Sequence, residues 1–282
     1  MDSKLYVSSL AFMGKPVKEM IQICAENLFN LEFSSGIPFH QDMEGIYLRA
    51  NIQKMLHNYF PAPKIPFVLN LASKNDKIRE MSIDHCKNGL SLSSKSNAPF
   101  FAAHAGFCID PDPAELGRKL SFDPDFDREL HKTLFEDSVK KILAYADSIQ
   151  VDFLVENNVL ASFNFDGVNP LLCIDSRGIN EFFEKVNHPR LGFLLDTAHL
   201  KVSCQTLNLD LDEELQLVKK HIKGIHHSDN EGEVDNNQPI GQDYWFLKYR
   251  DQFDSTVQVL EVKNQTVREI KDQLDLLGNL GS

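Results

Sequence analysis

The 282-residue chain lacks several features that would place it in a specialised class of protein. Its five cysteines are scattered, odd in number and never spaced as C-x-x-C, so neither a disulfide framework nor a thiolate zinc site is indicated. Apolar runs stay well short of the roughly 18 residues of a membrane span, and the N-terminus has no basic start before a long apolar stretch. We expect buried free thiols, a cytoplasmic protein and no membrane partner.

Positive charge and linker-like sequence are also scarce. The chain has 29 Lys and Arg against 41 Asp and Glu, a formal net charge of −12. Because binding to a DNA duplex depends on neutralising phosphates, this balance disfavours nucleic acid, although it does not forbid a local cationic patch. No Pro-, Gly- or Ser-rich tract divides the sequence, and α/β barrels commonly reach this length as one domain. We therefore predict one domain, residues 1–282.

What the chain does have is a regular alternation of short apolar runs with stretches of helical spacing. The strands are expected at 5–12, 30–36, 55–60, 97–107, 151–160, in the runs that stop at Asp196 and His226, and at 255–262. The helices are expected at 16–28, 42–54, 75–92, 127–148, 179–186, 211–221 and 264–280. This order predicts a parallel sheet with right-handed crossovers.

Eight strands favour closure into a barrel. No strand opens onto a Gly-rich phosphate loop of the G-x-G-x-x-G kind, and candidate polar residues follow nearly every strand instead of one switch point. We predict the α/β class and a single (β/α)8 TIM barrel. An open, doubly wound sheet is the alternative.

The chemistry is indicated by the residues that end the strands. Six consecutive strands end at a histidine or carboxylate, at intervals of 30 to 52 residues: His57, His104, Glu156, Asp196 with His199 three residues on, His226 and Glu261. In a barrel these side chains share the carboxyl face, where active sites lie. Imidazole and carboxylate together suit a divalent metal such as Zn, Mn, Co or Fe, and Mg less readily.

Each of these residues also has an ordinary structural explanation. A lone histidine at a strand end is more often a hydrogen-bonded structural residue than a ligand. Buried carboxylates such as Glu156 and Glu261, however, are costly without a cation nearby. Lys201 and Lys263 could supply one, yet the accompanying histidines fit a metal better. Glu32 ends the second strand, where it could contact substrate or form an internal ion pair.

Over nearly its whole length the sequence resembles the xylose isomerase-like TIM barrels, which include AP endonuclease family 2 and the sugar phosphate isomerases and epimerases. The resemblance is carried by the order and spacing of short motifs: NLEFSSG, LHNYFP, FVLNLAS, FFAAHAGF, FLVENN, FLLDTAHL, IHHSDNEG, DNNQPIG and VLEV. It implies that Glu156, Asp196, His226 and Glu261 coordinate a shared catalytic metal.

The resemblance also implies roles for three further histidines and one choice between neighbours. His199 would contact substrate or a second ion, and His57 with His104 would match the extra histidines of the multi-zinc, endonuclease IV-like branch. His226 is preferred to His227 because the family's ligand stands three residues before an aspartate, here Asp229.

One departure from the endonuclease-like pattern bears on mechanism. That branch carries an Asp-x-His pair after the seventh strand, whereas this chain has Asp235-Asn236-Asn237. Asparagine is a poor zinc ligand, so one or two divalent ions are expected in place of three, with Mn, Zn or Co favoured and Mg less so.

The function expected from these features is metal-dependent isomerisation or epimerisation of a small sugar, sugar phosphate or polyol. Glu156 and Glu261 would act as catalytic groups, and His199 and Glu32 as substrate contacts. The alternatives are a phosphodiester hydrolase of the endonuclease IV type, including an abasic-site nuclease, and a non-catalytic binding barrel. Assembly into a homo-oligomer is left open.

Overall fold

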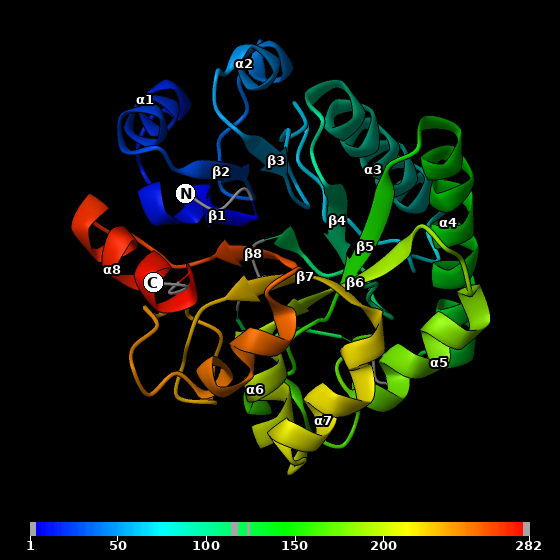
Figure 1. Cartoon of the computed structure of the whole chain (residues 1–282). Coiled ribbons are helices and arrows are strands. Elements are labelled where there is room, and N and C mark those ends of the chain that lie inside the picture. The colour runs from blue at the N-terminus through cyan, green and yellow to red at the C-terminus, as the bar shows by residue number, and fades with distance from the viewer. Residues whose placement is uncertain (1–3, 114–117, 123–124, 279–282) are drawn as a thin grey trace.

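Eight short parallel strands occupy the centre of the molecule, which we describe from a computed structural model covering residues 4–113, 118–122 and 125–278 (Figure 1). The strands are β1 (Leu5–Ser8), β2 (Asn30–Phe33), β3 (Lys54–Leu56), β4 (Phe100–His104), β5 (Asp152–Glu156), β6 (Leu191–Asp196), β7 (Ile222–His227) and β8 (Val257–Leu260). They pair in the order β3-β2-β1-β8-β7-β6-β5-β4, and each pair is parallel. The predicted (β/α)8 barrel is confirmed.

The barrel is nearly closed, and its weakest join lies between β3 and β4. There a single parallel bridge connects His57 to Ala102, and the backbone N–H of Asn58 donates to the carbonyl of Ala102 at 2.8 Å. By contrast, β4 and β5 are in register over five residue pairs. We call the β3–β4 join the seam.

Helices follow the strands and surround them in Figure 1. They are α1 (Val17–Asn27), α2 (Met43–Arg49), α3 (Asp76–Ser96), α4 (Arg128–Ile149), α5 (Ser176–Val186), α6 (Thr197–Leu207), α7 (Leu211–Val218) and α8 (Val267–Gly278). Asparagines at 97, 187 and 208 end α3, α5 and α6 in the left-handed conformation, which asparagine tolerates better than most residues.

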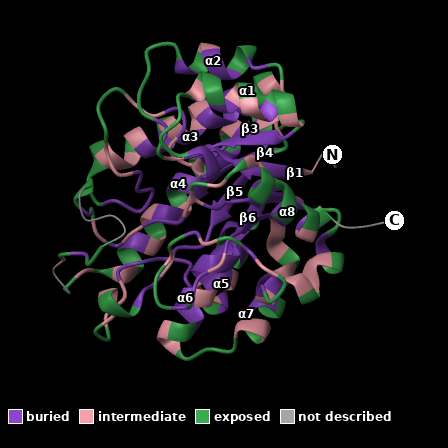
Figure 2. Cartoon of the chain, turned by 90° about the vertical axis from the view of Figure 1, so that its left-hand side faces the viewer, coloured by how far each residue is buried: buried purple, intermediate pink, exposed green. Residues whose placement is uncertain are grey.

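Apolar side chains pack against both faces of the strands, inside the barrel and between the strands and the helices. Figure 2 shows the buried residues gathered in the centre of the molecule. The larger core lies between strands and helices. A smaller one fills the barrel interior: Tyr6, Met55, Phe100, Ala102, Leu154, Leu194 and Val259. Gly224 leaves room for it, because a Cβ there would lie 2.9 Å from both Phe100 and Leu194. The interior is therefore a packed floor and not a pore.

Several expected boundaries were wrong. The first strand ends at Ser8, after which Ser9–Phe12 form a 3-10 helix (η1), and α2 ends at Arg49, five residues before the expected boundary. Three further described elements were not foreseen: the 3-10 helix η3 (Ser162–Asn164), α6 and the 3-10 helix η5 (Trp245–Phe253). Residues 279–280 of the expected last helix lie outside the described residues. The five cysteines are free and buried, as predicted. Within the described ranges, no helix is both long and apolar enough to span a membrane.

Candidate metal centre

The candidate ligands form the layer of the barrel interior just above the apolar floor. Side chains of a strand alternate between its two faces, so the second residue after an interior residue also faces the interior. Leu154 is thus followed by Glu156, and Leu194 by Asp196. The same step of two leads from Met55 to His57, from Ala102 to His104, from Gly224 to His226 and from Val259 to Glu261. On each of these six strands the interior residue changes from apolar or glycine to histidine or carboxylate within two positions. A polar layer therefore lies directly above the apolar floor.

The first group consists of Glu156, Asp196, His226 and Glu261. One candidate ligand atom from each lies within 4.8 Å of those of the other three. Nδ1 of His226 is 3.1 Å from Oε2 of Glu261 and 3.5 Å from Oε1 of Glu156. All four residues are buried, from 0% exposed for Asp196 to 8% for Glu261. The structure therefore brings together the four side chains that the resemblance implied.

A second group shares Glu156 with the first. His57 Nε2 and His104 Nδ1 lie 3.1 and 3.2 Å from the same oxygen, Oε2 of Glu156. These three residues could hold a metal ion by themselves. They come from β3, β4 and β5, so this group spans the seam.

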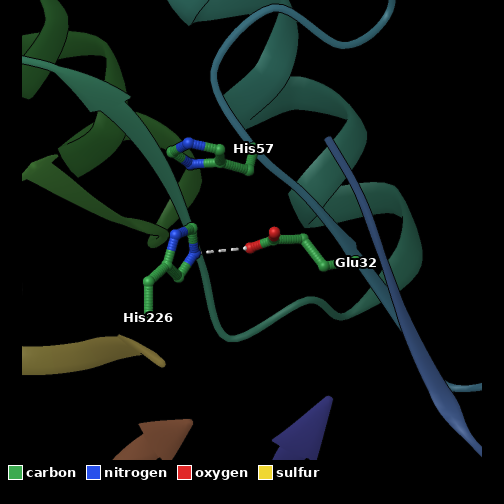
Figure 3. Close-up of side chains that lie close together, drawn as sticks. All are labelled: Glu32, His57 and His226. Atoms are coloured by element: carbon green, nitrogen blue, oxygen red, sulfur yellow. Dashed lines mark hydrogen bonds and ion pairs between the residues drawn. The ribbon is translucent and has the colours of Figure 1, made fainter. Parts of the chain in front are cut away.

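Glu32 lies on the other side of the His226 ring. Figure 3 shows its carboxylate directed at the imidazole, where Nε2–H of His226 donates to Oε2 at 3.0 Å. Glu32 is 0% exposed, which matches the internal ion pair considered as one of its two readings. The bond to Nε2 leaves Nδ1 facing Glu156 and Glu261, and it fixes the orientation of the ring. Glu32, His57 and His226 could also hold a metal ion by themselves. The expected contact of Glu32 with substrate stays a prediction.

His199 occupies the first turn of α6, beside the first group. Its backbone N–H donates to Oδ1 of Asp196 at 2.8 Å, and its Nδ1–H donates to the carbonyl of Asn157 at 2.8 Å. Its Nε2 lies 3.3 Å from Oδ2 of Asp235. Asp235 is thus a site residue that the expected ligand set did not contain. The available signal was its place in the 235–237 segment, where the endonuclease-like branch carries an aspartate.

The preference for His226 over His227 agrees with the side-chain directions. Nδ1 of His227 lies 3.0 Å from the Tyr244 hydroxyl and Nε2 lies 3.0 Å from Oε1 of Gln258, so both nitrogens have partners away from the carboxylates. Burial lowers the pKa of His227 to about 3. This histidine is neutral and held in place by the surrounding polar groups.

The charges in the layer are strongly coupled. Burial and the neighbouring carboxylates of Asp235, Glu261 and Glu156 raise the pKa of Asp196 to about 7. Burial opposes ionisation of Glu156 too, but the imidazoles of His104 and His57 outweigh it and hold that pKa well below its usual value.

The pKa of His226 is shifted upward, whereas burial shifts the pKa of an ordinary histidine downward. Burial alone would lower its pKa, yet the carboxylates of Glu32 and Glu261 raise it well above the usual value. These carboxylates favour a proton on Nδ1, which a cation held there would replace.

Unsatisfied oxygens provide the test of whether a metal fits. Both oxygens of Glu156, Oδ2 of Asp196, Oε1 of Glu32 and Oδ1 of Asp235 are buried and make no hydrogen bond of good geometry, although the imidazoles of His57 and His104 lie within 3.2 Å of Oε2 of Glu156. Buried carboxylate oxygens in that state are costly, and native proteins rarely leave them so. Carboxylate and imidazole donors are the set that a divalent ion of borderline character takes. The residues present therefore fit a divalent metal.

A cavity of about 460 Å³ opens next to this layer, and His104, His199 and Asp235 are among the residues that line it. Its volume lies within the usual range of small-molecule sites. The polar layer is therefore accessible to a ligand from the carboxyl end of the barrel.

Comparisons with known proteins bear on the fold and on the family. An uncharacterised protein of Methanocaldococcus jannaschii is 25% identical over 211 residues, covering 74% of this chain and 70% of that protein. A D-tagatose 3-epimerase-like protein superimposes with a TM-score of 0.71 at 18% identity, covering 97% of this chain and 98% of the other.

A second solved structure is the TTHB071 protein of Thermus thermophilus, from a crystal soaked with ZnCl2. It gives a TM-score of 0.65 at 16% identity, covering 98% of this chain and 100% of that one. At these identities the two structures establish the fold alone. The xylose isomerase-like TIM barrel family matches residues 21–279. Because that match spans most of the sequence, the chain belongs to the xylose isomerase-like TIM barrel family.

Proposed function

We propose that this chain is a metal-dependent isomerase or epimerase of a small sugar, sugar phosphate or polyol, acting by proton transfer next to a carbonyl group. The observation that carries the proposal is Glu156, whose two buried oxygens face three imidazoles without a well-formed hydrogen bond, at the point shared by two candidate ligand groups. The D-tagatose 3-epimerase-like structure supports sugar chemistry at the level of the family.

In this proposal Glu156, Asp196, His226 and Glu261 hold one divalent ion, and His57 and His104 with Glu156 hold a second when it is present. Mn, Zn or Co fits this donor set better than Mg, because histidine nitrogens are included. Bound there, the ion would polarise the substrate carbonyl and stabilise the charge that develops on its oxygen.

The protein's own residues supply the remaining steps. Glu156 and Glu261 reach His226 Nδ1 from two different strands, β5 and the end of β8. We assign them the removal and return of the proton on opposite faces of the substrate, a task that needs two carboxylates. His199 is held by Asp196, Asn157 and Asp235, and orients a substrate hydroxyl at the cavity. We further propose that residues 1–282 form one domain.

The decisive experiment is solvent isotope exchange. Metal-supplemented protein is incubated in deuterated water with a panel of ketoses, ketose phosphates and inosose-like polyols. We expect deuterium on a carbon next to the carbonyl of at least one compound, detected by mass spectrometry. Glu156→Gln should abolish the exchange, whereas Glu233→Gln, at an exposed position, should leave it unchanged.

The grouping of His57, His104 and Glu156 is the observation that keeps a hydrolase as the second candidate, since a second ion could activate water there. Metal-dependent cleavage of an abasic duplex or a model phosphodiester, without exchange across the panel, would replace the isomerase proposal by the hydrolase. Metal binding with neither activity would favour the binding barrel.

A further inference from the structure

The cavity beside the polar layer has largely apolar walls. They are contributed by the segments after β3, β4 and β5, and include Phe67, Leu120, Phe163 and Leu171. Leu120 and Leu171 belong to a hydrophobic cluster separate from the two barrel cores, against which Phe107 also packs. Part of the wall is thus a hydrophobic cluster of its own, and Phe67 packs against the larger core.

The polar groups in these walls are already committed to the protein. Asn158 donates through Nδ2 to the carbonyls of Ala105, Gly106 and Leu172. Asn164 accepts from the backbone N–H of Leu120 at 2.8 Å and donates to the carbonyl of Arg118 at 3.1 Å. The hydroxyl of Tyr59 accepts from the backbone N–H of Phe67 at 2.7 Å. A substrate hydroxyl placed against these walls would lose its hydrogen bonds to water and find few protein groups to replace them.

Unpaired polar atoms among the described lining residues belong to residues that neighbour the candidate metal centre. The amide oxygen of Asn58, next in sequence to His57, is buried without a hydrogen-bond partner, as is Oδ1 of Asp235 beside His199. His104, itself a candidate ligand, also lines the cavity. Arg118 is the one Lys or Arg among the described lining residues, and it is exposed. The cavity therefore has a polar end at the candidate metal centre and an apolar remainder.

We infer that the substrate is amphipathic: a short polar head with adjacent oxygens at the candidate metal centre, joined to an aryl or alkyl group that occupies the apolar part of the cavity. The head rests on the proposed function, and the apolar group rests on the cavity walls. A free sugar with a hydroxyl on every carbon could place two oxygens at the candidate metal centre, but it would leave the apolar walls without contacts. A carbonyl compound or sugar derivative that carries an apolar substituent fits them well.

Hydroxamates test the inference, because they present two adjacent oxygens to a metal on groups of chosen polarity. Calorimetry on Mn-loaded protein compares acetohydroxamate, 3-phenylpropionohydroxamate and the polyhydroxylated erythronohydroxamate. We expect the phenyl compound to bind about 10- to 100-fold more tightly than acetohydroxamate, the factor expected for burying a phenyl-sized group. Equal affinities, or tightest binding by erythronohydroxamate, would overturn the inference while leaving the metal centre intact.

A matched pair of variants locates the binding. Phe163 is 42% exposed at the cavity, so Phe163→Asn should fold and should remove most of the phenyl advantage without changing acetohydroxamate binding. Phe39 is similarly exposed, at 47%, but belongs to a different surface hollow, and Phe39→Asn should retain the advantage. An advantage that survives Phe163→Asn unchanged would count against this cavity.

A metal-independent measurement separates the inference from the proposed function. In metal-free protein, 4-fluorobenzyl alcohol should show fluorine NMR line broadening that Phe163→Asn reduces and Phe39→Asn does not. If no hydroxamate binds but this broadening is present, the proposed metal chemistry fails and the apolar subsite stands. Absence of broadening in the wild type would overturn the subsite.

Discussion

Glu261 and Glu156 approach the same nitrogen of His226 from different strands, so removing either charge changes the surroundings of one atom. We predict that Glu261→Gln lowers the divalent metal content of purified protein at least about tenfold, because an amide is a weaker, neutral donor. Elemental analysis after growth in metal-supplemented medium measures this, with the exposed Glu231→Gln as control. A wild type that is metal-free and takes up no ion by calorimetry would contradict the prediction.

Two hypotheses for Glu32, an ion pair that orients His226 and a contact with substrate, predict different effects of mutation on metal affinity. If it fixes the His226 ring, Glu32→Ala should weaken metal binding about 10- to 100-fold, as for other residues that orient ligands. Glu32→Gln should lose less, since its amide oxygen can still accept from Nε2–H. If Glu32 contacts substrate instead, both variants should keep their metal affinity and show a raised KM.

The transition from β6 to α6 uses one carboxylate for two purposes. Oδ1 of Asp196 caps α6 by accepting from His199 N–H, while the buried Oδ2 has no hydrogen-bond partner. Asp196→Asn should keep the cap and lose metal affinity. Asp196→Ala should lose both, with about 1 kcal/mol of further destabilisation from the missing cap. Chemical unfolding of the metal-free proteins, together with metal titration, separates the two effects.

The same residue predicts a pH dependence. Because burial raises the pKa of Asp196 to about 7, against roughly 3.9 in an unfolded chain, the folded state binds more protons between those values. The metal-free wild type should therefore lose stability as pH rises from about 4 to about 7. Asp196→Asn removes this contribution, so at pH 8 it should be at least as stable as the metal-free wild type. A flat difference between the two across this range would argue against the raised pKa.

The elements that could be predicted are helices with an apolar stripe and strands that form short apolar runs. Strand ends such as Glu156 and His226 were located because each apolar run stops at one titratable residue. Helix α6 was missed because Thr197–Cys204 are buried apart from the half-buried Lys201, which leaves no apolar stripe to detect. Asp235 was missed for a different reason: it stands in a loop, and its role depends on a tertiary contact with His199.

For the molecule as a whole, the seam connects metal binding to closure of the barrel. His57 stands on one side and His104 on the other, and both approach Glu156. We predict that metal slows amide hydrogen exchange most strongly in residues 54–58 and 100–104, since an ion there opposes local opening. Exchange measured by mass spectrometry with and without metal tests this. In the His57→Ala/His104→Ala double variant the protection should fall while β6–β7 stays protected.

Because a single bridge links β3 to β4, these two strands are the edges of the sheet and are covered only while the seam is closed. If the seam opens, β3 and β4 each present unpaired backbone donors and acceptors, which are a template for pairing with another chain. A chelator would then alter the colloidal behaviour of the protein as well as its chemistry. Metal-depleted preparations should self-associate with time and protein concentration, beginning at these two strands, and the ion would serve to keep copies of the chain apart.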